Sequence, residues 1–148
     1  SHVAHDCVVG NNVIMTNNAV IGGHVRLGDG VIIGGNAAVH QFCRIGRKAM
    51  IGGLSGVDRD VIPFGIVTGD RGKLRGLNVI GLKRSGYDEG VVKSITKAFM
   101  FIFKGKEGTF EDRLAQAHEK FKDNEMVMEQ VKFIDEALQG RRKIMVAE

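Results

Sequence analysis

The first residues of the chain gather side chains that can do chemistry. The stretch SHVAHDC places two histidines, an aspartate and a cysteine within six positions, at His2, His5, Asp6 and Cys7. Such a set could hold a metal ion, activate a thiol with a neighbouring base, or pair an imidazole base with a carboxylate that orients it. Which of these chemistries applies depends on the elements that position the side chains.

A six-residue period runs through residues 3–62. Read in sixes from Val3, the first position is apolar in ten hexads of ten, the second is glycine in six, and the fifth is always small or β-branched. Neither a helical stripe near 3.6 residues nor a strand alternation of 2 gives this period. It predicts a parallel β-helix, in which each hexad supplies a short strand and a corner and apolar residues point into a narrow prism. Such hexapeptide repeats are typical of left-handed β-helices with three hexads in each coil.

Three hexads per coil bring the histidines together. Residues separated by three hexads then lie above one another at the spacing of paired strands, about 4.8 Å. His5, His24 and His40 fall on one face in successive coils, and His2 falls at the corner just before it. Because the repeat itself never requires histidine, this clustering indicates a functional site.

The cysteines and Ser55 do not form a nucleophilic site in this frame. Cys7 and Cys43 occupy the inward fifth position two coils apart, about 10 Å, which is too far for a disulfide. Ser55 has no histidine in its own hexad and is expected to be a small inward or corner residue. The glycines follow the repeat and form no phosphate-binding loop of the G-x-x-x-x-G-K-[ST] type. We therefore expect two free, buried thiols and no serine or cysteine nucleophile.

A metal site is a further alternative at the histidines. Neutral imidazole is a common zinc ligand, and some left-handed β-helix proteins, the gamma-class carbonic anhydrases, bind zinc between subunits through an H-x4-H pair and a distant third histidine. No such pair occurs in this sequence, since His24 and His40 stand much further apart along the chain. We therefore expect no metal.

The repeat decays after Ile62. Residues 63–86 are rich in glycine and in apolar residues, and we expect them to cap the last coil, since an open prism end would expose apolar surface. Helices are predicted at about 88–104, 110–121 and 125–138, with an N-cap at Asp88, a capping box at Thr109 and Asp112, and a stop at Gly140. The sequence thus predicts a β-helix unit over residues 1–72 and a helical domain over residues 73–148.

Composition and charge exclude several classes of protein. The chain has 148 residues, 43% of them hydrophobic, which is enough for a real core. Its net charge of +4 is dispersed, which favours acidic or phosphorylated partners over nucleic acid. No apolar run reaches the roughly 18 residues needed to cross a bilayer, and no charged segment precedes a hydrophobic one at the start. We expect a cytoplasmic protein that inserts into no membrane.

Four motifs, HVAHDC, GGHV, AVHQF and GLKRSG, together resemble the UDP-N-acetylglucosamine 3-O-acyltransferase family of lipid A synthesis. The resemblance covers the whole chain but only the later half of a family member, since family members begin with several more coils. It implies an enzyme that moves a 3-hydroxyacyl group from an acyl carrier protein thioester to the 3-hydroxyl of UDP-N-acetylglucosamine. This transfer is direct and needs no cofactor and no metal.

The resemblance also implies roles for individual residues. His5 matches the general base, Asp6 the carboxylate that orients it, and Gly23 the residue whose N–H holds the thioester oxyanion. Positions that contact the substrates match His2, His24, His40 and Gln41, those near the nucleotide match Asn78 and Arg84, and the acyl-chain groove matches Gly53. Ser85 and Arg71 depart from the family, where a second arginine and a histidine are common.

The resemblance implies an assembly as well. Family members are homotrimers with the site between neighbouring prisms, and a basic helical region would suit an acidic carrier protein. Two alternatives stay open: an N-acyltransferase acting on a 3-amino UDP-sugar, and a truncated trimeric fragment without turnover.

Overall fold

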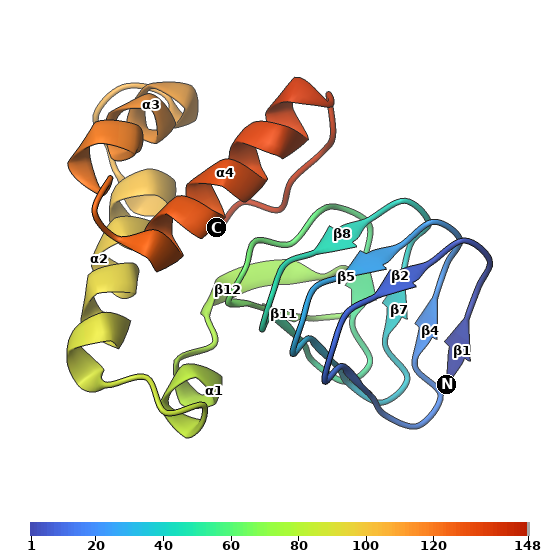
Figure 1. Cartoon of the computed structure of the whole chain (residues 1–148). Helices are drawn as coiled ribbons and strands as arrows, with labels where there is room; N and C mark the ends of the chain where they lie inside the picture. Colours follow the sequence, from blue (N-terminus) through green and yellow to red (C-terminus); the bar gives the residue numbers. More distant parts are fainter. Residues whose placement is uncertain (148) are drawn as a thin grey trace.

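The computed structural model describes residues 1–147 and shows a prism of stacked coils followed by helices (Figure 1). The coils run from β1 at the N-terminal end of the prism to the β11–β12 hairpin, and helices α2 to α4 lie beyond that hairpin. The prism strands have two residues each: β1 (His2–Val3), β2 (Val8–Val9), β3 (Ile14–Met15), β4 (Val20–Ile21), β5 (Arg26–Leu27), β6 (Ile32–Ile33), β7 (Ala38–Val39), β8 (Arg44–Ile45), β9 (Met50–Ile51) and β10 (Gly56–Val57). The hairpin comprises β11 (Gly65–Thr68) and β12 (Lys73–Leu77).

The strands form three sheets, one for each side of the prism. Sheet A has the order β1-β4-β7-β10, sheet B the order β2-β5-β8, and sheet C the order β12-β11-β9-β6-β3. Each parallel partner in the first coils lies three hexads further along the chain, as in the pairs His2 with Val20 and Val20 with Ala38. This register confirms three hexads per coil.

The hexad positions divide cleanly between core and corner. The inward first and fifth positions are buried from the second coil onward, for example Ile21, Val25 and Ile33, each 0% exposed. The fourth position takes a left-handed backbone conformation in every hexad up to residue 54, with φ between 56° and 71°. Asparagine, aspartate and glycine tolerate that conformation best, which explains why they recur there.

The repeat frame shifts by two residues inside the last hexad, VDRDVI. Val61 pairs with Ile45 and Ile66 pairs with Met50, so these partners are two positions closer in sequence than three full hexads. The expectation of an unbroken frame to Ile62 is therefore wrong within this hexad. As a result Asp60, which a regular frame would place at an exposed corner, is only 2% exposed.

The end of the prism is closed by the hairpin and by the end of the chain. β12 pairs antiparallel with β11, and residues near the C-terminus return to the prism through the bridges Asp60 with Ile144 and Leu74 with Ala147. The predicted cap is thus present. The predicted boundary at residue 72 falls inside the hairpin, because strand pairing continues to Leu77.

Four helices follow in residues 78–147: α1 (Val79–Arg84), α2 (Glu89–Lys104), α3 (Phe110–Lys120) and α4 (Glu125–Gln139). Asp88 caps α2, Thr109 and Asp112 form a capping box on α3, and Gly140 ends α4, as predicted. The short α1 was not predicted. No helix within the described residues is long and apolar enough to cross a membrane.

Polar contacts fix α4 against the prism. Arg47 binds the carboxylate of Glu129 through Nε and Nη2 at 3.0 to 3.1 Å, and the buried Gln130 donates to the carbonyl of Pro63 at 2.9 Å. The helical region and the β-helix are therefore one packed body at this contact.

Candidate active site

His5, Asp6 and His24 meet at the corner between sheets A and B. His24 lies one coil beyond Asp6 along the prism, at the same hexad position, and its backbone N–H donates to the carbonyl of His5 at 3.0 Å. The side chains converge on one carboxylate oxygen, with His5 Nδ1 at 3.0 Å and His24 Nε2 at 3.8 Å from Asp6 Oδ2. The two imidazoles contact each other edge to face, with ring centroids 5.2 Å apart. The prediction that His5 and His24 stack in successive coils is confirmed, but both lie at a corner of the prism and not on one of its faces.

The carboxylate of Asp6 ionises more readily than an ordinary aspartate. Its pKa lies below the usual value, mainly because of the hydrogen bond with His5, with a smaller effect from the charge of His24. An ionised acceptor beside Nδ1 favours the imidazole tautomer that carries its proton there. The Nε2 atom of His5 is then left with a free lone pair, which is what a general base needs.

The ring of His5 lies against Gly23. A Cβ atom added to Gly23 would come within 2.8 Å of Cε1 and Nε2 of His5, so a glycine is required for the ring to stay where it is. The carbonyl of Gly23 accepts from the N–H of Phe42 at 2.9 Å, while its own N–H has no hydrogen-bond partner among the described residues. An unpaired N–H beside the base could bind an oxyanion.

The other residues predicted to contact the substrates near this corner are His2, His40 and Gln41. They do not join the triad of His5, Asp6 and His24. His40 is one coil beyond His24, and its Nδ1 lies 3.2 Å from the carbonyl oxygen of Gln41. The ring that stacks on His24 belongs to Phe42, with centroids 4.8 Å apart and an interplanar angle of 7°. His2 lies in strand β1 and not at the corner, because β1 ends at Val3 and the corner begins only at His5.

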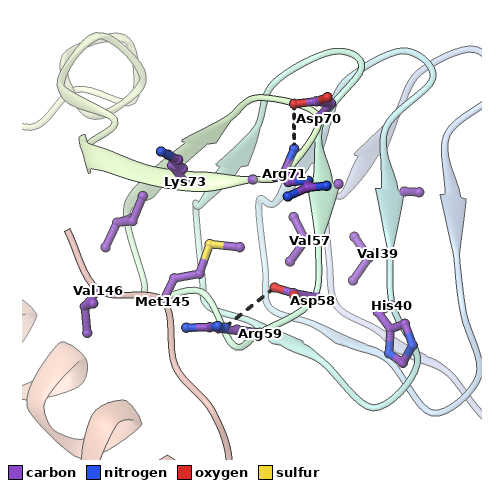
Figure 2. A pocket seen from close by; sticks show the side chains of 14 residues that line it. Val39, His40, Val57, Asp58, Arg59, Asp70, Arg71, Lys73, Met145 and Val146 are labelled. Carbon is purple, nitrogen blue, oxygen red and sulfur yellow. Dashed lines mark hydrogen bonds and ion pairs between the residues drawn. The ribbon is translucent and has the colours of Figure 1, made fainter. Parts of the chain in front are cut away.

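A cavity of about 750 Å³ begins beside His40 and extends to the hairpin. Figure 2 shows His40 at one edge, Asp70 and Arg71 at another, and Met145 with Val146 on the C-terminal segment opposite. Ala38 and Gly56 belong to the lining as well, so the strand positions of sheet A that face outward offer only small residues there. The remaining lining residues are Val39, Val57, Asp58, Arg59, Gly72, Lys73 and Leu74.

Three of the predicted site residues lie elsewhere in the chain. Gly53 is at the corner between sheets C and A and does not line the cavity. Asn78 is 8% exposed and caps α1 by accepting from the N–H of Gly81 at 3.1 Å. Arg84 is exposed in the last turn of α1, near the contact between Lys48 Nζ and Ser85 Oγ at the corner between sheets B and C. A single chain therefore does not bring the predicted nucleotide contacts to His5.

The triad also has donor atoms of the kind that bind zinc. One ligand atom from each of His5, Asp6 and His24 lies within 4.8 Å of the others, and all three residues are exposed. The close pair, His5 Nδ1 and Asp6 Oδ2, has the length of a hydrogen bond. The absence of a metal stays a prediction.

Comparison with known proteins shows the family. The family described as UDP N-acetylglucosamine O-acyltransferase, domain 2, matches residues 60–145, which is more than half of the chain. The chain belongs to the UDP-N-acetylglucosamine O-acyltransferase family. The motifs HVAHDC, GGHV and AVHQF, which lie before the matched residues, resemble the same family.

Relatives in this acyltransferase family are similar over most of the chain. Proteins named acyl-[acyl-carrier-protein]–UDP-N-acetylglucosamine O-acyltransferase from Caulobacter vibrioides and Rhizobium etli are 53% and 48% identical over 134 residues, 90% of the chain and 51% and 49% of those proteins. The solved structure of a UDP-N-acetylglucosamine acyltransferase from Arabidopsis matches with a TM-score of 0.90 and 35% identity, over 95% of the chain and 51% of its own. The chain spans about half the length of the curated relatives it matches.

Sequence reasoning missed one aromatic residue at this corner. Phe42 lies three hexads after His24, so the same spacing that stacked the histidines places it above His24. It also stands at a hexad position where the backbone is left-handed, which phenylalanine seldom adopts. A phenylalanine at a position that favours asparagine, aspartate or glycine was the signal in the sequence that could have pointed to Phe42.

Proposed function

We propose that the protein of which this chain is a part transfers a 3-hydroxyacyl group from acyl carrier protein to the 3-hydroxyl of UDP-N-acetylglucosamine, the first step of lipid A synthesis. The observation that carries the proposal is the 3.0 Å contact from His5 Nδ1 to the carboxylate of Asp6, which leaves Nε2 free as a base. The names of the relatives supply the donor and the acceptor. With these reactants the enzyme would act in the cytoplasm.

The proposed reaction is a direct transfer. Nε2 of His5 removes the proton of the sugar 3-hydroxyl, whose oxygen attacks the carbonyl carbon of the thioester. The N–H of Gly23 stabilises the resulting oxyanion. When the intermediate collapses, the carbon–sulfur bond breaks and His5 returns the proton to the leaving thiolate. Asp6 stabilises the imidazolium that forms between these two steps, and no residue is acylated.

The proposed enzyme is a homotrimer with its site between prisms. Support comes from the separation within one chain, since Asn78 and Arg84 lie beside a different corner from His5. The side chains of His5, Asp6 and His24 are 74%, 67% and 44% exposed, so a second wall is needed to exclude water from the reaction. A neighbouring copy would supply that wall and the nucleotide contacts. Light scattering tests this assembly, and a monomer at assay concentration would contradict it.

The acyl chain is proposed to occupy the cavity beside His40. Its small outward residue Ala38 leaves room for a hydrocarbon chain beside His40, whereas the carbonyl of Asp70 already covers Gly56. In Ala38→Leu, three extra carbon atoms would fill part of this space, so transfer should shift toward shorter acyl groups. Val8→Leu, at an outward and exposed strand position of sheet B, is the matched control. The groove predicted at Gly53 is tested by Gly53→Met in the same assay.

The decisive experiment measures acyl transfer with labelled UDP-N-acetylglucosamine and 3-hydroxyacyl carrier proteins. The chain is compared with a version extended at its N-terminus by the preceding coils of a relative, each with and without His5→Ala. Loss of general-base catalysis should lower kcat by about 10² to 10⁴. Near-normal activity of His5→Ala would overturn the assignment.

Two controls separate the alternatives. Supplying a 3-amino UDP-sugar beside UDP-N-acetylglucosamine distinguishes N-transfer from O-transfer. Stoichiometric zinc in the purified protein, with activity lost to a chelator, would contradict the prediction that the reaction uses no metal.

A further inference from the structure

Phe42 combines three features that local preferences do not explain. Its backbone has φ 67°, a left-handed conformation that costs a bulky L-residue roughly 1 to 2 kcal/mol. Its side chain is 54% exposed, so burial in the core does not offset this cost. In the same hexad position of the preceding coils stand Asp6 and His24, both members of the candidate site.

The ring of Phe42 lies parallel to the His24 imidazole. The two rings are stacked face to face with centroids 4.8 Å apart and an angle of 7°. His24 therefore lies between Phe42 on one side and the pair His5 and Asp6 on the other. An imidazole held in this plane directs Nε2 toward Asp6, whereas an unstacked ring could rotate about its side-chain bonds.

Phe42 is itself held by an ion pair between the buried Asp60 and the half-buried Arg142. Arg142 Nη2 donates to the carbonyl of Phe42, and the same guanidinium contacts Asp60 through Nε at 2.7 Å and Nη2 at 3.0 Å. Asp60 also accepts from the backbone N–H and from Nε of Arg44, at 2.9 and 3.0 Å. The shift of the repeat frame at residues 58–61 is what buries Asp60, so the shift supplies the anchor for this contact.

The residues described above surround one cavity at the corner between sheets A and B. Asp6, His24, Phe42 and Arg142 line the same small cavity of about 250 Å³, together with Arg26 and Arg44. The pKa of Arg142 is raised, mainly by its hydrogen bond to Asp60, so this guanidinium stays charged throughout the working pH range. The path from the end of the chain to the candidate base therefore runs through Arg142, Phe42 and His24.

We propose that Phe42 is a positioning residue: its ring holds the imidazole of His24 toward Asp6, and the Asp60–Arg142 pair holds Phe42 in place. The step from this geometry to acyl transfer rests on the function proposed above. The orientation of the His24 ring by Phe42 does not depend on that function, and it can be measured without any acyl transfer.

Phe42→Leu and Phe42→Tyr separate ring stacking from general packing. Leucine already occupies the same backbone conformation at Leu54, with φ 62°, so Phe42→Leu removes the ring without new backbone strain. Tyrosine keeps the ring. Asn12→Ala, at the same hexad position of another corner with φ 58°, is the control for a general loss of stability.

The first readout is the NMR signal of the His24 ring protons in histidine-labelled protein. A stacked phenyl ring shields them, so they should move downfield in Phe42→Leu and stay in place in Phe42→Tyr and Asn12→Ala. Arg142→Gln should move them in the same direction as Phe42→Leu. Unchanged His24 signals in folded Phe42→Leu, judged by the rest of the spectrum, would overturn the proposal. If Phe42→Leu does not fold, unchanged His24 signals in Arg142→Gln would overturn it instead.

The second readout is kinetic. Phe42→Leu should lower kcat about tenfold with KM nearly unchanged, as a misplacement of a few tenths of an ångström predicts, and Phe42→Tyr should restore it to within about twofold. Equal kcat in Phe42→Leu and wild type, with His5→Ala inactive, would refute the role in catalysis. If His5→Ala stays active, the proposed function fails, while the NMR result still decides the geometry.

Discussion

The contact between Gly23 and His5 gives a quantitative prediction. In Gly23→Ala the new Cβ would lie 2.8 Å from Cε1 and Nε2 of His5, whereas ordinary contacts begin at 3.4 Å. The ring must therefore move by about 0.6 Å. Misplacing a catalytic group by 1 Å lowers the reaction rate on the order of a hundredfold. A displacement of the His5 ring by about 0.6 Å should therefore lower kcat about tenfold.

The variant should not lose stability. The φ angle of Gly23 is outside the left-handed range, so alanine fits the backbone there, and Gly to Ala replacements at such positions stabilise by about 0.4 to 1 kcal/mol through the unfolded chain. His5 is largely exposed and can move aside without disturbing the core. Alanine also keeps the N–H, so the proposed oxyanion contact is not removed.

Gly35→Ala is the matched control. Gly35 occupies the same third position of its hexad at a different corner, and a Cβ there would lie 3.5 Å from the carbonyl oxygen of Asn17, an ordinary contact. Acyl-transfer kinetics and thermal unfolding are measured for both variants. The reasoning is refuted if Gly23→Ala keeps the wild-type kcat, or if both variants lose activity equally. A higher KM with unchanged kcat would mean that the methyl group obstructs the substrate and not the base.

Other predictions concern the prism. Ser55 Oγ is buried and has no hydrogen-bond partner among the described residues, so Ser55→Ala should raise the free energy of unfolding by about 1 kcal/mol in a urea titration. Burial raises the pKa of Cys43 to about 12; native protein at pH 8.5 should therefore be alkylated at Cys43 on the order of a thousandfold more slowly than unfolded protein, by mass spectrometry. Asp60→Ala removes the partner of Arg44 and Arg142 and should destabilise by about 3 kcal/mol; a loss below about 1 kcal/mol would show that water replaces the carboxylate.

The sequence predicts the coils well because a strict period fixes which residues are neighbours. Spacing alone placed His24 beside His5, and capping residues located three of the four helices. The frame shift escaped prediction because VDRDVI still fits the six-residue pattern, with an apolar first residue and valine in fifth place. Only strand pairing shows that the last corner is two residues shorter.

The site was less predictable than the fold. The closeness of His5 and His24 follows from the repeat, since equivalent hexads stack in successive coils, whereas Asp6 was assigned by resemblance. Asn78 and Arg84 were assigned by resemblance alone, and their place depends on packing between helix α1 and the prism, which no short-range pattern encodes. The contact from Arg142 to Phe42 joins distant parts of the chain, beyond the reach of any local rule.

The separation of hexad positions bears on how such a protein can evolve. The first and fifth positions carry the core, while the third and fourth positions of the corner carry His5, Asp6 and His24, which contribute little to that core. A mutation in the corner can therefore change the chemistry without unfolding the coil beneath it. Each further coil places one more corner residue above the equivalent residue of the coil before it. A new specificity can therefore arise by altering one residue in an otherwise unchanged scaffold.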